Sequence, residues 1–201
     1  ADFVEIFLEN TDNISVLVEE DYITSVSPSF GRGAGIRVFK DKRDGFVSTN
    51  DLTRKGLISS IAQAIEMLDI NSTIIRNFEG LENIRNYSVD KKNWLYSIPT
   101  INEIGEKLLS STEFLKKEER VNVRKGSYSR NWQKVIIASS DGTFAKDIRL
   151  HQTVGLNVIA LDKQYRSSGS RRFGSSDSPN DFKNWNHEEA ANEVLESSMS
   201  M

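Results

Sequence analysis

Polar and apolar residues alternate through most of the first fifty residues of the chain. Such alternation is typical of strands that bury one face, because successive side chains point to opposite sides of a sheet. Clusters of turn-forming residues separate the alternating runs, so the pattern predicts short antiparallel strands joined as a meander. The expected inward positions are Phe3, Ile6, Phe7, Ile14, Val16, Val18, Ile23, Val26, Ile36, Val38 and Phe46, and the expected turns lie at 10–13, 19–21, 31–33 and 41–45.

The hydrophobic period changes to that of a helix after Thr53. A second helix is predicted after Pro99, because Thr100 and Glu103 have the spacing of a capping box. The stripe of the first helix should cover one face of the sheet, and that of the second should face inward. Residues 71–98 have weaker periodicity and are expected to be a connecting segment with one short strand or helical turn. The expected stripe positions are Leu57, Ile58, Ile61, Ala62, Ile65 and Leu68 in the first helix, and Ile101, Ile104, Leu108 and Leu115 in the second.

Alternation returns after Lys117 and predicts further strands as far as Leu161. Asp141-Gly142 lies between two of these runs and predicts a two-residue hairpin turn, since both residues accept positive φ angles. Residues near 167–182 are mostly Ser, Gly, Arg and Asp, which predicts a mobile loop. A last helix should open near Asn186.

These elements predict an α+β fold with antiparallel sheets, helices packed on one face and two sub-domains. The first sub-domain is expected over residues 1–70, a connecting segment with one helix over 71–118, and the second sub-domain over 119–201. The chain starts directly in a strand pattern without Met and stops inside a helical pattern. We therefore expect a segment of a longer protein whose final helix is truncated.

Composition narrows the chemistry that the chain can perform. Its 201 residues are 37% hydrophobic and 27% charged, enough for one ordinary core or two small ones, and no apolar run is long enough to cross a bilayer. A cytoplasmic location is expected. The absence of cysteine removes thiolate nucleophiles and Cys-ligated zinc, and only His151 and His187 remain as imidazole ligands. A net charge of -3 makes nucleic acid an improbable partner, although a local basic patch stays possible.

One string resembles the start of a zinc-protease motif, namely His187-Glu188 at the predicted last helix. A zinc site of this type needs a second His about one turn later, and Ala191 and Asn192 occupy those positions. Helix capping by Asn186 explains the same residues better. No Ser-centred elbow motif is present either, so we assign no catalytic and no metal-ligating residue to this chain.

Two other segments are candidate binding elements. Gly31, Gly33 and Gly35 precede a strand and not a helix, so they are better explained by backbone geometry at a hairpin than by a phosphate loop, and they would also allow another chain to approach the backbone closely. Arg166, Arg171, Arg172 and Phe173 are candidate contacts in a basic segment with interleaved aromatics that also contains Lys163 and Tyr165. Such a segment is typical of contacts to phosphates, substrate carboxylates or a partner subunit. A solvated loop is the simpler interpretation of that segment.

Taken in order, several strings resemble the TldD/PmbA family. The first two, Gly33-Ala-Gly-Ile-Arg-Val38 and Asp44-Gly-Phe-Val-Ser-Thr-Asn-Asp-Leu52, are similar to its amino-terminal domain. The later strings, Val135-Ile-Ile-Ala-Ser-Ser-Asp-Gly-Thr-Phe-Ala-Lys-Asp-Ile-Arg149 and Gly169-Ser-Arg-Arg-Phe-Gly174, are similar to its second segment and look closer to TldD than to PmbA. The likeness covers nearly the whole chain.

The resemblance implies a cytosolic, dimeric zinc metallopeptidase that cleaves peptides or unfolded proteins. In that family the His-Glu-x-x-x-His helix and a further Cys ligand lie beyond the equivalent of Met201, so zinc is expected in the missing carboxyl-terminal lobe and no cofactor in this segment. The segment itself would gate substrate and help to form a homodimer or a heterodimer with a related subunit.

Two alternatives stay open at this point. The chain could be a binding module that contacts nucleic acid or a DNA-handling protein, as the name gyrase modulator used in this family suggests. It could also belong to a catalytically silent partner subunit of the peptidase.

Overall fold

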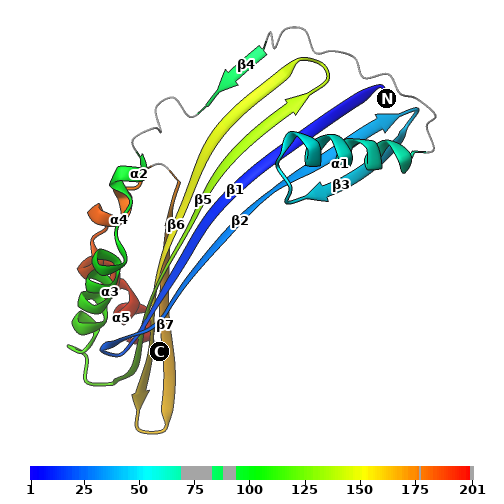
Figure 1. The fold of residues 1–201 in the computed structure, drawn as a ribbon. Helices are drawn as coiled ribbons and strands as arrows, with labels where there is room; N and C mark the ends of the chain where they lie inside the picture. The colour runs from blue at the N-terminus through cyan, green and yellow to red at the C-terminus, as the bar shows by residue number, and fades with distance from the viewer. Residues whose placement is uncertain (69–82, 88–93, 177, 200–201) are drawn as a thin grey trace. The chain divides into compact units, whose positions relative to one another are not determined.

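The computed structural model describes residues 1–68, 83–87, 94–176 and 178–199 (Figure 1). The chain divides into two compact units, and each unit is assembled from separate stretches of sequence. Unit 1 comprises 1–11, 30–92 and 133–148, and unit 2 comprises 12–29, 93–132 and 149–201. The elements are β1 (Phe3–Glu19), β2 (Tyr22–Lys40), β3 (Arg43–Thr49), α1 (Arg54–Glu66), β4 (Asn83–Asn86), α2 (Trp94–Ser97), α3 (Ile101–Leu115), β5 (Val121–Ser139), β6 (Thr143–Asp162), β7 (Tyr165–Ser175), α4 (Asp181–Asn184) and α5 (His187–Met199).

Within the described residues, the strands form one seven-stranded sheet in the order β3-β2-β1-β5-β6-β4, with β7 also paired to β6. β3 is antiparallel to β2 and β7 is antiparallel to β6, while the short β4 runs parallel to β6. An α+β architecture with helices packed on an antiparallel sheet confirms the predicted fold class. Because β1, β2, β5 and β6 each contribute to both units, the unit boundaries do not follow the sequential divisions predicted at residues 70 and 118.

Several predicted turns are confirmed by backbone geometry. Glu20 has φ 54°, and Asp41 and Lys42 have φ 49° and 67°, which are conformations suited to tight hairpin connections. The turn predicted at Asp141-Gly142 is present, but its loop has three residues, 140–142, and not two. Gly142 has φ 88° and donates its N–H to the carbonyl of Ser139 over 3.1 Å, whereas Asp141 does not adopt the positive φ that a two-residue loop would need.

The turns predicted at 10–13 and 31–33 are wrong, because both segments continue as strand within β1 and β2. Their polar side chains find partners across the strands instead of closing a turn. Thr11 donates its hydroxyl to the carbonyl of Gly31 over 3.4 Å, and the Asn13 amide donates to the Ser29 hydroxyl over 3.3 Å. The predicted meander is therefore built from fewer and longer strands.

In unit 1, α1 packs against β3 and its neighbours. The helix begins after Thr53, whose hydroxyl accepts a hydrogen bond from the Gly56 amide. The predicted stripe needs one correction, because Ile58 is 48% exposed and Ala62 is also exposed, while Ala64 is fully buried. The core of this unit consists of Ile36, Val38, Ala64 and Leu68, with Val4, Ile6, Val47, Leu57, Ile61 and Ile65 packed around them.

In unit 2, α3 packs against α5, and the two helices cover apolar side chains of the sheet. The predicted capping box is confirmed, since the Thr100 hydroxyl accepts from the Glu103 amide and the Glu103 carboxylate accepts from the Thr100 amide. Ile101 was expected to face inward but is 44% exposed. The buried core residues are Ile14, Val16, Val18, Ile104, Leu108, Tyr128, Val154 and Phe182 in one cluster, and Leu115, Leu156, Val158, Ala190, Ala191 and Val194 in the other.

The mobile loop predicted near 167–182 is wrong over most of its length, because Tyr165–Ser175 forms β7. Its small residues allow α5 to approach the strand directly. A Cβ added at Gly169 would lie 2.2 Å from the carbonyl oxygen of Val194, and the Ser167 hydroxyl donates to the carbonyl of Ser198 over 2.6 Å. The residues of β7 have little strand propensity of their own, so packing against α5 and pairing with β6 stabilise the strand conformation.

Candidate functional site

The strand β7 separates the four residues that the sequence grouped as one basic segment. Side chains alternate along a strand, and Arg171 and Phe173 lie opposite Leu156 and Val154, which are buried under the helices. Arg166 and Arg172 lie opposite Leu161 and Gly155, on the sheet face that α5 does not cover. The structure therefore brings Arg166 and Arg172 to one face and turns Arg171 and Phe173 to the other.

The two residues on the helix side have partners within unit 2. Arg171 forms an ion pair with Glu193 of α5 at 3.1 Å. The Phe173 ring lies 5.7 Å from the Trp185 ring and packs against the buried cluster of α5. Both side chains hold β7 to the helix layer, which leaves Phe173 unable to serve as an exposed stacking platform.

Arg166 and Arg172 are exposed, and no ion pair or hydrogen bond of their side chains is present among the residues that the structure describes. Between them, Ser168 and Ser170 are exposed as well, as is Gly174 after them. These five alternate residues, Arg166, Ser168, Ser170, Arg172 and Gly174, are called the outer row of β7 below.

The hydrogen bonding of the hairpin determines where the backbone of the outer row points. Lys163 and Gln164 form a two-residue loop, and Asp162 pairs with Tyr165. In such a hairpin the residues that flank the loop exchange both backbone bonds, and bonded and non-bonded pairs then alternate along the strands. Tyr165 and every second residue after it therefore bond to β6, while the N–H and C=O groups of the outer row point away from β6.

This outward backbone is a free sheet edge. In the described part of the chain β7 pairs with β6 alone. A row of unpaired N–H and C=O groups is a template on which an extended chain can add as a further strand. The edge combines that template with two cationic side chains. The sequence did not indicate that these residues form an edge strand, because it predicted a loop here.

The three glycines proposed for close backbone approach lie in β2, within unit 1. Each one faces another part of the same chain. A Cβ added at Gly31 would lie 2.8 Å from the Thr11 hydroxyl oxygen, and one at Gly35 would lie 3.2 Å from the Phe46 ring. At Gly33 it would lie 3.2 Å from the Asn50 side-chain oxygen. The close neighbours of these glycines are thus residues of this chain.

The two histidines have separate structural partners. His151, on β6, shares a hydrogen bond of 2.8 Å between its Nδ1 and the Ser176 hydroxyl. His187 opens α5 with its ring 6.4 Å from that of Trp185. Among the residues with described positions there is no group of three or more His, Cys, Asp or Glu side chains able to hold a metal ion, so these residues do not fit a zinc site.

The capping interpretation of the His187-Glu188 string is confirmed. The Glu189 amide donates to the Asn186 side-chain oxygen over 3.3 Å, and the Asn186 amide group donates to the Glu189 carboxylate over 3.2 Å. The first bond satisfies a backbone amide at the first turn of α5 that the helix leaves without an internal partner, and the second joins the two side chains.

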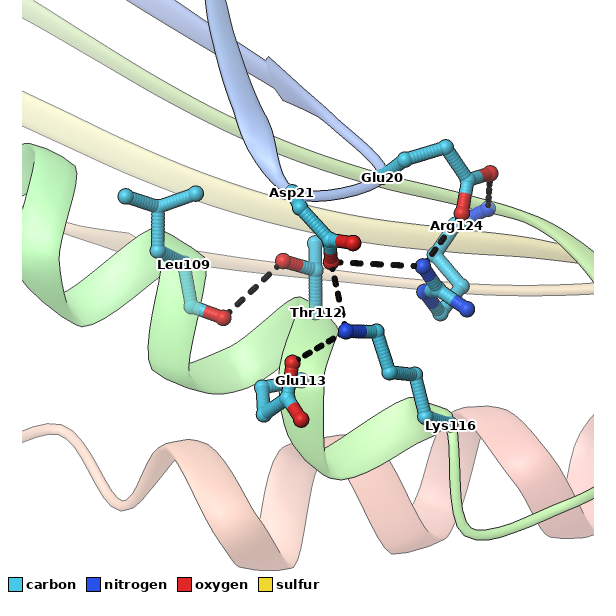
Figure 2. Close-up of polar contacts among 7 residues, drawn as sticks. All are labelled: Glu20, Asp21, Leu109, Thr112, Glu113, Lys116 and Arg124. Atoms are coloured by element: carbon cyan, nitrogen blue, oxygen red, sulfur yellow. Dashed lines mark hydrogen bonds and ion pairs between the residues drawn. The ribbon is translucent and has the colours of Figure 1, made fainter.

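A charged groove in unit 2 was not predicted from the sequence. It has a volume of about 720 Å³ and is lined partly by the β1–β2 turn and the end of α3. Figure 2 shows Lys116 between two carboxylates, with its Nζ 2.8 Å from Asp21 and 2.5 Å from Glu113. The hydrogen bond from Lys116 lowers the pKa of Asp21 below its ordinary value, and the same contact raises the pKa of Lys116.

Arg124 of β5 completes this network with an ion pair to Glu20 and a longer one of 3.5 Å to Asp21 (Figure 2). These ion pairs hold the hairpin tip to α3 and β5. The partners in this network are about a hundred residues apart in sequence, with separations of 103 and 104 for the Arg124 contacts, so local patterns could not reveal it.

Comparison with protein families and solved structures supplies a further set of observations. A family model described as PmbA/TldA metallopeptidase domain 1 matches residues 4–68, and a model of the PmbA/TldA metallopeptidase central domain matches residues 60–201. No curated protein matches the chain.

Three solved structures share the fold at low sequence identity. A proposed modulator of a DNA gyrase from Thermotoga maritima is 19% identical with a TM-score of 0.75, covering 98% of this chain and 44% of that one. A proposed modulator of DNA gyrase from Bacteroides thetaiotaomicron is 16% identical with a TM-score of 0.70, covering 99% and 46%. TldE from Thermococcus kodakarensis is 21% identical with a TM-score of 0.73, covering 96% and 44%. This chain thus spans less than half the length of each of these proteins.

Proposed function

Because the chain belongs to the PmbA/TldA metallopeptidase family, whose first and central domain models match residues 4–68 and 60–201, we propose that it is the non-catalytic amino-terminal half of a TldD-like zinc metallopeptidase. Its substrates would be peptides or unfolded proteins, and the whole enzyme would be a cytoplasmic homodimer or a heterodimer with a related subunit. Zinc would be bound in the carboxyl-terminal lobe, which lies outside this chain.

The donor set of the chain supports this division of labour. Zinc in a peptidase is held by three protein ligands and activates a water molecule in its fourth position. This chain has no cysteine and only two histidines, one bonded to Ser176 and the other packed beside Trp185. The chemistry of peptide cleavage is therefore assigned to the other lobe, and this half would bind and position the substrate.

The free edge of β7 is the observation that carries the binding role. Main-chain hydrogen bonds to an added strand give affinity that depends little on the sequence of the bound segment, which suits an enzyme that accepts unfolded chains. An extended substrate held along β7 would be kept from folding back and could be passed to the zinc lobe. Substrate gating of this kind needs no reactive group in this half.

The proposal is tested by comparing this chain, produced alone, with the full-length protein. Both are assayed for zinc binding and for peptide hydrolysis. We expect the full-length protein to bind zinc in calorimetry and to cleave an unfolded protein such as casein. The isolated chain should do neither. Tight zinc binding or zinc-dependent hydrolysis by the isolated chain would contradict the assignment of roles to the two halves.

The remaining sequence of the parent protein distinguishes the active from the silent type of subunit. Two histidines spaced for zinc on one helix would identify an active peptidase subunit. Their absence would assign this chain to the silent partner within the dimer.

A further inference from the structure

We propose that the outer row of β7 selects extended segments that carry carboxylates six residues apart on one face. This proposal rests on the binding role proposed above and specifies its substrate class. It uses two features that the structure places together: backbone groups of the outer row that point away from β6, and two exposed arginines on the uncovered face of the sheet.

The spacing of the two arginines defines the motif. Arg166 and Arg172 are six residues apart on the same side of a strand, which corresponds to about 20 Å at roughly 3.4 Å per residue. A strand added beside β7 has the same rise, so its residues at i and i+6 lie opposite the two guanidinium groups. The intervening positions i+2 and i+4 lie opposite Ser168 and Ser170, which leave room for small polar side chains.

The positive charge of Arg166 and Arg172 favours an acidic peptide segment as the ligand of this edge. A guanidinium binds a carboxylate through charge-assisted hydrogen bonds, and opposite charges on neighbouring strands stabilise pairing. A second copy of β7 is disfavoured, because antiparallel pairing centred on Gly169 would set Arg166 against Arg172. Single-stranded nucleic acid is also disfavoured, because neither aromatic residue of β7 belongs to the outer row. Phe173 packs on the opposite face against Trp185, and Tyr165 alternates with Arg166 and so projects to that same opposite face.

Arg171 provides a matched control within the same strand. It is adjacent to Arg172 and has the same chemistry, but it lies on the helix side and pairs with Glu193. If the two exposed arginines recognise carboxylates of the bound segment, then substitution of Arg166 or Arg172, but not of Arg171, should change the selectivity for acidic peptides. Loss of Arg171 should affect the packing of α5 instead.

Fluorescence anisotropy with labelled nonapeptides and the full-length protein tests the proposal. The in-phase peptide has Glu at its second and eighth positions, Ser at its fourth and sixth, and Thr elsewhere. The out-of-phase peptide moves the second Glu to the seventh position, which keeps composition and charge but turns that Glu to the opposite face. A third peptide replaces both Glu residues by Gln.

We expect the in-phase peptide to bind more tightly than the Gln peptide by about two- to five-fold for each arginine pair. The out-of-phase peptide should lose the increase in affinity that comes from one of the two Glu–Arg pairs. In the Arg166→Gln/Arg172→Gln variant the three peptides should bind alike, whereas Arg171→Gln should keep the order of the wild type. The preference should also weaken at high salt, because exposed charges are screened.

Blocking the edge separates selectivity from binding. Ser170→Pro removes one outward N–H without removing a bond to β6, so it should abolish binding of all three peptides while the melting temperature shows that the protein is folded. In-phase peptides whose backbone nitrogens directed toward β7 are N-methylated should not bind the wild-type protein.

Three outcomes would overturn the inference in distinguishable ways. Equal binding of all peptides to the wild type, lost in Ser170→Pro, would remove the acidic selectivity and keep the peptide-binding role. No binding of any peptide would remove both. Tighter binding of oligothymidylate than of any peptide, lost in the double arginine variant, would assign the arginines to nucleic acid.

Discussion

At the scale of single residues, several buried or partly buried polar side chains in unit 2 bond to partners that are distant in sequence. The Tyr128 hydroxyl donates to the Gln152 side-chain oxygen over 2.9 Å, and the Gln152 amide donates to the Ser178 carbonyl over 2.8 Å. Lys107 donates to the carbonyls of Phe182 and Lys183 at 2.9 and 2.6 Å, and its partial burial lowers its pKa. An unmet buried donor costs about 1–3 kcal/mol, so these contacts constrain how the segments of the unit pack.

Tyr128 should lose its proton at unusually high pH. Its side chain is 1% exposed, and burial raises its pKa to about 12. Because this folded-state pKa lies above the ordinary value of 10, the stability that Tyr128 contributes is present below pH 10 and is lost as the pH rises through 12. A tyrosinate absorbance titration at high pH checks this.

The Tyr128→Phe variant is the matched control for that titration. Subtracting its curve from that of the wild type isolates one of the five tyrosines. A difference curve centred near pH 10 would show that Tyr128 is not buried as described. The variant should also lower the free energy of unfolding by about 1 kcal/mol, since Gln152 loses its donor.

At the scale of elements, each unit uses a strand glycine to bring a helix onto the sheet. In unit 1 a Cβ at Gly45 of β3 would lie 2.2 Å from the Ala64 carbonyl oxygen of α1. In unit 2 a Cβ at Gly169 of β7 would lie 2.2 Å from the Val194 carbonyl oxygen of α5. These close approaches involve helix backbone, which cannot yield as a flexible side chain can.

Gly169→Ala should destabilise the protein by about 1–3 kcal/mol, because α5 must move away from β7 to admit the methyl group. Gly174→Ala is the control on the same strand, since its added Cβ would meet only the Gln152 carbonyl oxygen at 3.6 Å, an ordinary contact. We expect that change to stay within about 0.5 kcal/mol. Urea unfolding measures both variants, and equal midpoints would contradict the packing of α5 on β7.

At the scale of the whole molecule, exposed carboxylates account for much of the expected pH dependence. Hydrogen bonds to the ionised forms lower the pKa of five of them below ordinary values. The principal donors are Lys116 for Asp21, the Thr53 side chain for Asp51, the Thr100 amide for Glu103, Arg120 for Glu118 and the Ser139 hydroxyl for Asp141.

Stability should therefore decline in acid. A carboxyl group whose folded pKa is lowered contributes stability above its unfolded value, and this contribution is lost as the pH falls through the folded pKa. With ordinary values of 3.8 and 4.5 for Asp and Glu, the urea midpoint should be steady near neutrality and fall below about pH 4.5.

An Asp51→Asn/Glu103→Gln/Asp141→Asn variant should show a flatter pH profile than the wild type. Glu66→Gln serves as the control, because that exposed helix carboxylate forms no ion pair or hydrogen bond with the described residues. An acid profile unchanged in the triple variant would mean that other groups control acid unfolding.

No helix in the described ranges is both long and apolar enough to cross a membrane. The strands form a sheet with helices packed against it, and α5 and β7 together frame the candidate binding edge. The sequence did not locate this edge or the charged groove. The edge depends on the pairing of β7 with β6, and the groove depends on contacts such as Lys116 with Asp21 that no local pattern relates.

The sequence by itself determined what depends on neighbouring residues. Alternation defined most of the strands, Thr100 and Glu103 defined a helix start, and Asp141-Gly142 defined a turn, because each follows from local backbone chemistry. Only the tertiary structure decided that Tyr165–Ser175 is a strand, since its Ser, Gly and Arg residues gain strand structure from β6 and α5. That decision also turned Arg172 away from Arg171, because side chains alternate only once the chain is extended.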